Sequence, residues 1–218
     1  MKNINNILIV DDHKIFREGL EYVVSQMEGF KLVGEASDGK VFLEMIDELD
    51  VDIVLMDISM PGIDGIEATV KALEKKPNLK IVALTMFCDE GYLLKMIQAG
   101  VYGYVLKESG KNELTTALKA VAEGENYFSH KLLSNILVDL GNSKSFKVPA
   151  KHKETKLTVR ELEVLNLICQ GMTNSEISDK LCLSPRTVEG HKANLISKTG
   201  SKNSVSLVMF AMKNKLVE

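Results

Sequence analysis

The sequence predicts an α/β domain with a parallel sheet, followed by a smaller all-helical domain. Short apolar runs alternate with amphipathic stretches over the first 125 residues, whereas no strand-like pattern appears from residue 157 onwards. The charge also changes sign: residues 1–130 carry 13 Lys and Arg against 22 Asp and Glu, a net of −9, and residues 131–218 carry 14 against 8, a net of +6. An acidic front and a basic back indicate two modules with different partners, and the basic module could meet a polyanion.

Five short apolar runs rich in Val and Ile predict the strands of the first domain, over residues 1–125. These runs are 7–10, 30–36, 52–56, 80–85 and 102–107. Uninterrupted apolar runs suit strands that are buried on both faces of a parallel sheet. The stretches between them repeat apolar residues every three or four positions, as in Val41, Phe42 and Met45, and predict amphipathic helices. The expected fold is a five-stranded, doubly wound parallel sheet, which binds ligands at the carboxyl ends of its strands.

Residues 126–156 are expected to connect the two domains. The stretch 130–140 has a helical pattern, and 141–156 has five Lys against one Glu and no apolar periodicity, which is typical of a linker. A solvated loop inside one domain is the alternative. The reversal of charge across the segment favours a boundary.

Residues 157–218 predict four short helices, near 159–170, 174–181, 185–199 and 203–214. Capping boxes, N-caps and glycine stops mark their ends, at Thr158 with Glu161, Thr173 with Glu176, Ser184-Pro185, Gly171 and Gly200. Only three residues separate the second and third helices, as in a helix-turn-helix. Eight residues are expected to form the helical core: Leu162, Leu165, Leu167, Ile168, Ile177, Leu181, Val188 and Leu195.

The composition, 45% hydrophobic and 26% charged, is typical of a globular protein. No apolar run approaches the roughly 18 residues of a membrane span, and the N-terminus reaches Asp11 and Asp12 too early for a signal peptide. We therefore expect a cytoplasmic protein with no membrane partner. Three cysteines without metal-binding spacing disfavour a disulfide framework or zinc site, and each is expected to be a small buried residue: Cys88, Cys169 and Cys182.

Polar groups end four of the predicted strands. Asp11 and Asp12 follow the first strand, Asp57 the third, and Thr85 and Lys107 end the fourth and fifth. Each has an ordinary explanation alone, as a turn, cap or strand residue, but their occurrence together at one sheet edge is informative. Clustered carboxylates repel one another, and Mg²⁺ would relieve that repulsion. A metal, a carboxylate and a lysine could hold a phosphoryl group, with an aspartate as its covalent acceptor.

Residues 5–123 resemble a two-component receiver domain, which has a flavodoxin-like fold. The matching motifs are DD at 11–12, LMDISMPGIDG at 55–65, LT at 84–85 and GYVLK at 103–107. The resemblance implies that Asp57 accepts a phosphoryl group from the phosphohistidine of a histidine kinase. It implies that Mg²⁺ is bound by Asp12, Asp57 and the Ser59 backbone carbonyl, with Asp11 acting largely through water. It also makes Thr85 and Tyr104 a switch pair and places Lys107 on the phosphoryl oxygens.

The stretch LTVRELEVLNLICQGMTNSEISDKLCLSPRTVEGHKANLISKTG, residues 157–200, resembles the LuxR-type helix-turn-helix of the NarL/FixJ regulators. The resemblance implies that 185–199 is a recognition helix in the DNA major groove. By the same resemblance, base edges are met by Glu189, Gly190 and Ala193. Phosphate or mixed contacts fall to Arg186, Thr187, Lys192, Asn194 and Lys198.

Two roles stay open in this module. Glu189 either accepts from a cytosine amino group or pairs with Lys192 on a solvated face, and Gly190 indicates either close approach to DNA or simple tolerance. The last helix carries more apolar surface than a small core needs, and in the family it pairs two modules. The expected dimerisation residues are Val205, Val208, Met209 and Met212. The alternative is that this helix only covers its own core.

The sequence therefore indicates a phosphorylation-dependent transcription regulator rather than an enzyme. Its expected cofactor is Mg²⁺, and its expected partners are a histidine kinase, double-stranded DNA and, when phosphorylated, a second copy. An Mg²⁺-dependent phosphotransferase is disfavoured because Ser59 stands where its acid/base residue should be. A dinucleotide-binding enzyme is disfavoured because no G-x-G-x-x-G follows the first strand. Nothing indicates a receiver that has lost phosphorylation, since the acidic residues and the lysine are all present.

Overall fold

The structure is a computed structural model that describes residues 4–86, 90–128, 157–214 and 216. The chain divides into two compact units, Met1–Leu137 and Val138–Glu218. The predicted helix at 130–140 and the linker at 141–156 lie outside the described residues. Within the described residues, no helix combines the length and apolar character needed to cross a bilayer.

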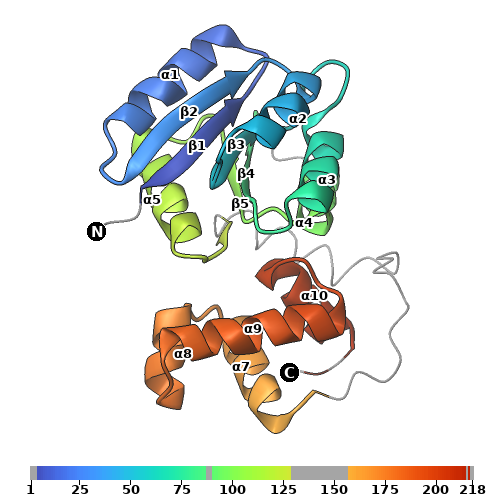
Figure 1. Ribbon diagram of the computed structural model, residues 1–218. Coiled ribbons are helices and arrows are strands. Elements are labelled where there is room, and N and C mark those ends of the chain that lie inside the picture. The colour runs from blue at the N-terminus through green and yellow to red at the C-terminus, as the bar shows by residue number, and fades with distance from the viewer. Residues whose placement is uncertain (1–3, 87–89, 129–156, 215, 217–218) are drawn as a thin grey trace. The chain divides into compact units, whose positions relative to one another are not determined.

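The first unit is built on a parallel sheet with the order β2-β1-β3-β4-β5-β6 (Figure 1). Its strands are β1 (Asn5–Val10), β2 (Phe30–Ala36), β3 (Ile53–Asp57), β4 (Lys80–Thr85), β5 (Gly103–Leu106) and β6 (Tyr127–Phe128). The predicted doubly wound fold is confirmed, but the strand count is six rather than five. The sixth strand has two residues, which pair with Gly103 and Tyr104 of β5. A strand this short has no periodicity by which the sequence could reveal it.

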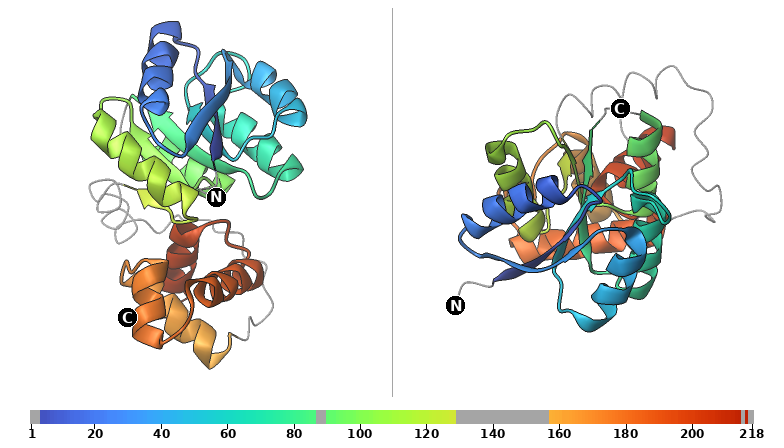
Figure 2. Two further views of the ribbon diagram at one scale, coloured as in Figure 1. Left: turned by 60° about the vertical axis from the view of Figure 1, so that its left-hand side comes forward. Right: turned by 90° about the horizontal axis from the view of Figure 1, so that it is seen from above.

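Helices cover both faces of this sheet (Figure 2). They are α1 (Lys14–Ser25), α2 (Gly39–Glu48), α3 (Gly65–Lys75), α4 (Glu90–Ala99) and α5 (Lys111–Ala122). Leu20 of α1 and Leu118 of α5 share a core cluster with Ile7 and Leu55, so these two helices pack on the same face. All five residues of β3 are buried. The central strand therefore presents Asp57 at its carboxyl end from a fixed position.

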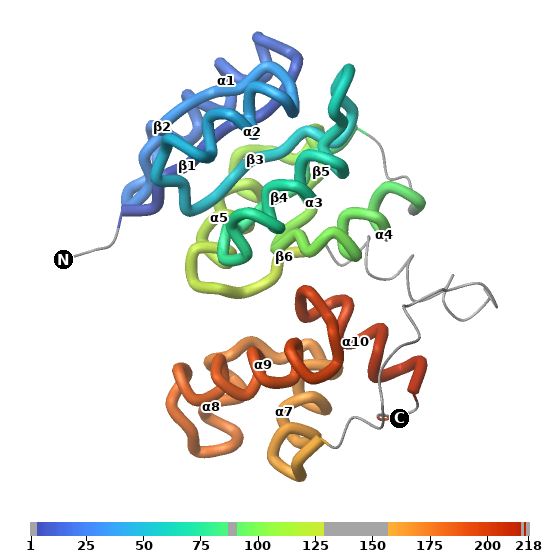
Figure 3. Tube along the Cα trace, turned by 45° about the vertical axis from the view of Figure 1, so that its right-hand side comes forward, coloured from blue at the N-terminus to red at the C-terminus, as the bar shows by residue number. Residues whose placement is uncertain are grey.

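The described part of the second unit consists of four helices: α7 (Val159–Cys169), α8 (Asn174–Leu181), α9 (Pro185–Thr199) and α10 (Ser204–Lys213). Figure 3 shows the path of the chain through these helices. All four helices agree with the predicted ranges to within one residue. Both predicted capping boxes are present, and Ser184 caps α9 with Pro185 in its first turn. The core contains Leu165, Ile177, Val188, Leu195 and Leu207.

Two sequence-based predictions about single side chains of this unit are wrong. Leu162, expected in the core, is 37% exposed, because the inward row of α7 runs through Glu161, Val164, Leu165 and Ile168. Cys182, expected to be buried, is exposed. It takes a left-handed conformation, φ 52°, at the end of α8, and this helix-terminating position turns its side chain outwards.

The other cysteines differ. Cys169 is half-buried, and burial raises the pKa of its thiol to about 11. The thiol therefore stays protonated at neutral pH and behaves as the small apolar residue that was expected. Cys88 lies outside the described residues.

Candidate phosphoacceptor pocket and DNA-binding surface

The carboxyl ends of β1 and β3 bring the predicted acidic residues together. Asp11 and Asp57 are buried and Asp12 is half-buried. The Lys107 ammonium, with a side chain 3% exposed, lies 2.6 Å from Asp11 Oδ2 and 2.8 Å from Asp57 Oδ2. The backbone N–H of Lys107 donates to the carbonyl of Thr85 (2.7 Å). The strand-end groups predicted from the sequence therefore converge on one pocket.

The charges in this pocket are not balanced. Burial raises the pKa of the Asp57 carboxyl, and the Lys107 ammonium opposes that rise through a hydrogen bond and its charge. One buried ammonium faces the two buried carboxylates, and Asp12 adds a third negative group at the rim. An all-oxygen cluster with surplus negative charge has the chemistry that binds a hard divalent cation. The residues present therefore fit such an ion.

The turn after β3 folds back over Asp57. The Ser59 N–H donates to Asp57 Oδ1 (3.3 Å), and the Gly65 N–H donates to the Ile58 carbonyl (3.0 Å). A Cβ at position 65 would overlap the carbonyl oxygen of Asp57. The absence of a side chain at Gly65 thus allows α3 to begin directly against the backbone of the acidic strand.

Three residues at the start of α1, for which the sequence predicted no role, make contacts around the pocket. The Arg17 guanidinium donates to the Asp11 carbonyl (Nη1, 2.6 Å) and to Glu35 Oε2 (Nε, 3.1 Å). Phe16 lies under Lys107, with the ammonium 4.7 Å from its ring centre, and His13 Nδ1 lies 2.8 Å from Asp12 Oδ1. Their position directly after the aspartate pair is the signal that could have identified them.

Thr85 and Tyr104, predicted as a switch pair, stand on neighbouring strands. Thr85 pairs with Leu106 in the register and Ala83 pairs with Tyr104. Because side chains alternate along strands, Thr85 and Tyr104 face the same side of the sheet. Tyr104 is fully buried and Thr85 is 5% exposed. Their placement is compatible with a coupled movement of the hydroxyl and the ring.

An apolar groove with a volume of about 420 Å³ lies beside the pocket. Ile15 and Phe16 of α1, Leu114 of α5, and Met86 line it, and Lys107 forms part of its wall. Ile15 is 85% exposed. Met86, which lines the same groove, is 61% exposed, and exposed apolar side chains that gather in one place are typical of a surface that binds a partner.

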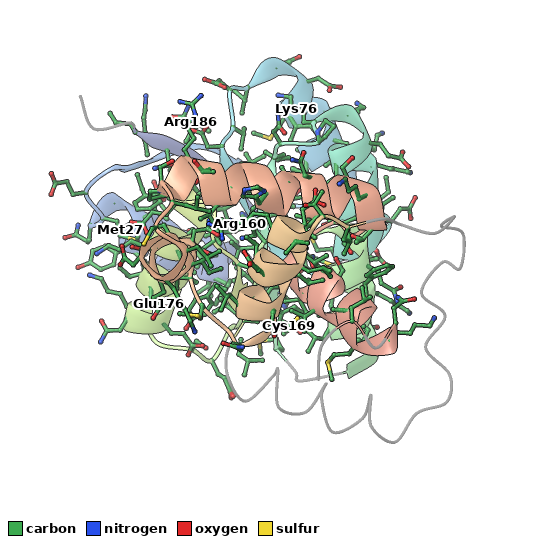
Figure 4. The ribbon with its side chains drawn as sticks, turned by 90° about the horizontal axis from the view of Figure 1, so that it is seen from below. Met27, Lys76, Arg160, Cys169, Glu176 and Arg186 are labelled. Atoms are coloured by element: carbon green, nitrogen blue, oxygen red, sulfur yellow. The ribbon has the colours of Figure 1, made fainter. Side chains whose placement is uncertain are left out.

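Helix α9 has an inward and an outward side. The inward row is Val188, Lys192, Leu195 and Thr199, and all four are buried. The outward side carries the remaining predicted contacts, which are exposed: Arg186, Thr187, Glu189, Gly190, Ala193 and Asn194. Arg186 stands at the beginning of the helix (Figure 4). Lys192 lies in the inward row of its own unit, and its contact with DNA phosphates stays a prediction.

Lys198, also predicted to contact DNA, has a structural partner. Its ammonium lies 2.7 Å from Glu161 Oε2, and Glu161 also accepts from the N–H of Thr158 in the capping box of α7 (2.8 Å). These contacts, the Lys198 hydrogen bond first, lower the pKa of the Glu161 carboxyl. Arg160 donates to the Leu181 carbonyl at the end of α8 (2.8 Å). α7 therefore fastens both helices of the helix-turn-helix.

The last helix, α10, covers its own core and still exposes apolar surface. Leu207 and Ala211 belong to the core of the second unit, and Val208 packs against it. Met209 is buried, Val205 is half-buried and Met212 is 45% exposed. This helix therefore covers its own core and leaves part of its apolar surface exposed, and its role in dimerisation stays a prediction.

Sequence comparisons match both units to known families. The response regulator receiver domain matches residues 7–119, and the bacterial regulatory proteins of the luxR family match residues 155–211. The oxygen regulatory protein NreC of Staphylococcus epidermidis is 38% identical, over 97% of this chain and 99% of its own. The chain belongs to this family of response regulators. It is therefore a transcription regulator with a receiver domain and a luxR-type DNA-binding domain, and regulation in this family depends on phosphorylation.

Solved structures of response regulators resemble the whole chain. RcsB of Salmonella typhimurium gives a TM-score of 0.59 at 28% identity, covering 97% of this chain and 99% of that one. A complex of RcsB with DNA gives 0.56 at 28% identity, covering 96% and 98%. The receiver fold and the helical DNA-binding fold of these response regulators thus occur in the same order along this chain.

Proposed function

We propose that Asp57 is the phosphoacceptor of this response regulator and that its phosphorylation controls DNA binding by the second unit. The contact that carries the proposal is the 2.8 Å pair between Asp57 Oδ2 and the buried Lys107. Asp11 is less available, because its Oδ1 accepts the His13 N–H (2.9 Å) and its Oδ2 faces Lys107. Asp57 Oδ1 accepts only the long bond from Ser59 among the described contacts, so it is the carboxylate oxygen best placed to react.

In the proposed reaction, an oxygen of Asp57 attacks the phosphorus of a phosphohistidine, and the phosphorus–nitrogen bond breaks as the imidazole leaves. Lys107, held 2.8 Å from Asp57 Oδ2, would meet the charge that gathers on the transferring oxygens. Thr85 supplies a hydroxyl at the end of the next strand. Mg²⁺, held by Asp12, Asp57 and the Ser59 carbonyl, would neutralise phosphoryl charge that one lysine cannot offset.

The phosphodonor is proposed to be a histidine kinase that docks in the apolar groove between α1 and α5. The groove wall includes Lys107, so a protein seated there would stand next to Asp57. Ile15 and Met86 offer exposed apolar contact area at this place. Apolar contacts next to a reactive group increase the affinity of a partner and also position the partner's own reactive atom.

For DNA, the outward side of α9 is proposed to enter the major groove. Arg186 would contact phosphates, and Glu189, Gly190 and Ala193 would face base edges. The complex of the relative RcsB with DNA supports this proposal, as does the structure of RcsB dimers bound to DNA. We propose that the phosphorylated chain likewise binds as a homodimer, with exposed residues of α10 such as Met212 at the contact.

Mass spectrometry after incubation with acetyl phosphate and Mg²⁺ tests the phosphoacceptor. We expect one added phosphoryl group on the wild type and on Asp47→Asn, a control at a surface carboxylate paired with Lys75. Asp57→Asn should add none, because its amide is not a nucleophile. Full labelling of Asp57→Asn would overturn the assignment.

A further inference from the structure

His13 is the N-cap residue of α1, but its side chain makes no capping hydrogen bond. Its imidazole turns to the acidic pocket, with Nδ1 2.8 Å from Asp12 Oδ1 and 3.4 Å from Asp11 Oδ1. We propose that His13 is a nitrogen ligand that allows the pocket to hold a transition-metal ion, such as Ni²⁺, in place of Mg²⁺. This inference rests on the metal pocket assigned above and concerns which ions that pocket accepts.

The spacing of the ligand atoms fits a single ion. Asp11, Asp12, His13 and Asp57 each offer one atom, and these atoms all lie within 4.8 Å of one another. Two ligands about 2.1 Å from an octahedral ion and at right angles to each other stand about 3.0 Å apart. The distance from His13 Nδ1 to Asp12 Oδ1, 2.8 Å, is close to that value. The imidazole is therefore close enough to Asp12 for both side chains to bind the same ion.

The chemistry of the ligand atoms determines which metal ions a His13 ligand would help to bind. Asp11 Oδ1 accepts the His13 N–H at 2.9 Å and its Oδ2 faces Lys107, whereas Asp57 Oδ1 accepts only the long bond from Ser59 (3.3 Å) among the described contacts. Asp12, Asp57 and the His13 imidazole are therefore the groups proposed for direct coordination. Mg²⁺ prefers oxygen ligands and gains little from a ring nitrogen, whereas imidazole suits Ni²⁺, Zn²⁺ and Fe²⁺. The His13 side chain is 67% exposed, so an ion can enter past it without unfolding.

The deciding variant is His13→Asn in the full-length protein. Asn is among the best residues at a helix N-cap, so α1 keeps its start, and its amide oxygen still suits Mg²⁺ while the nitrogen ligand is gone. Equilibrium dialysis with Ni²⁺, and calorimetric titration with Mg²⁺, give the two dissociation constants. We expect the Ni²⁺ dissociation constant of the pocket to rise by at least about tenfold, with Mg²⁺ affinity retained. His191→Asn, which removes an imidazole from the second unit, should leave both constants unchanged.

Asp57→Asn separates the two proposals. Loss of both metals in this variant is expected, and it places both ions in the pocket. If Asp57→Asn loses both but His13→Asn binds Ni²⁺ like the wild type, the role of His13 is overturned and the metal pocket stands. If Asp57→Asn keeps both metals, the pocket itself is wrong and the inference falls with it. An equal loss of Mg²⁺ and Ni²⁺ in His13→Asn would also overturn it, because it would show that His13 acts only by orienting Asp12.

Discussion

A side chain at position 65 would overlap the backbone that carries the proposed phosphoacceptor. A Cβ there meets the Asp57 carbonyl and the Ile58 Cα, whereas at Gly19, in the middle of α1, it meets nothing within 4 Å. Forcing extra volume into a packed site costs about 1–3 kcal/mol. The cost at Gly65 falls on the acceptor strand because α3 is held against it by the bond to Ile58.

We expect Gly65→Ala to slow labelling of Asp57 by acetyl phosphate and to lower the melting temperature of the first unit. Gly19→Ala, the matched control, should label at the wild-type rate, since Ala is better than Gly inside a helix. Labelling rates from mass spectrometry and melting curves from calorimetry provide the comparison. If Gly65→Ala and Gly19→Ala are labelled at the same rate, the backbone at Asp57 accommodates the added methyl group without slowing phosphorylation.

Among the helices, α7 is held against α9 partly by one ion pair, between Glu161 and Lys198. Glu161 and Glu176 occupy the same place in two capping boxes, but within the part of the chain that the structure describes only Glu161 pairs with a lysine. Exchanging a charge-assisted hydrogen bond for a neutral one costs about 1 kcal/mol, which corresponds to about 4–8 °C in a domain of this size. Glu161→Gln should therefore melt earlier than Glu176→Gln, as measured by calorimetry on the transition of the second unit.

The same comparison has a pH dependence. Because the pKa of Glu161 is lowered from its ordinary value of 4.5 in the folded state, its stabilisation is present in full above pH 4.5 and is lost as the pH falls through the folded pKa. The gap in melting temperature between the wild type and Glu161→Gln should close below pH 4.5. A gap that is constant from pH 7 to pH 3 would rule out the ion pair as its cause.

The recognition helix gives a prediction about DNA. Arg186→Ala should weaken binding to all sequences alike and reduce the slope of log affinity against log salt by about 1, since one phosphate contact is lost. Glu189→Ala should instead change the base preferred at one position of the site. Binding curves at several salt concentrations and a sequence-selection experiment measure the two effects. An unchanged preferred site for Glu189→Ala would return Glu189 to the solvated-face interpretation.

Most helices and strands, and the pocket, could be predicted from the sequence. Hydrophobic periodicity identifies the helices and strands, and the positions of the strand ends locate the polar residues of the pocket. Val and Ile runs place strand ends, and parallel strands put Asp11, Asp57 and Lys107 at one edge. What the sequence could not predict depends on packing. Lys192 was assigned to DNA by resemblance, and only the packed helix shows that its row faces inwards. His13 stands directly after the aspartate pair, but its proposed role depends on its distance to Asp12, which only the structure shows.

In the whole molecule, a phosphoryl group in the acidic unit must change DNA binding by the basic unit. Thr85 and Tyr104, on the same side of neighbouring strands, are the proposed two-state element. The phosphoryl group can shift that equilibrium only by the difference in its interaction with the two states. We propose that the shift favours a dimer, which raises DNA affinity because two linked modules read two half-sites together.

Sedimentation of the full-length protein, alone and with a duplex carrying its selected site, tests this claim most directly. With acetyl phosphate and Mg²⁺, the wild type should sediment as a dimer and bind the duplex at lower protein concentration, and Asp57→Asn should do neither. A phosphorylated wild type that stays monomeric both free and on the duplex would contradict dimerisation as the link between the two units.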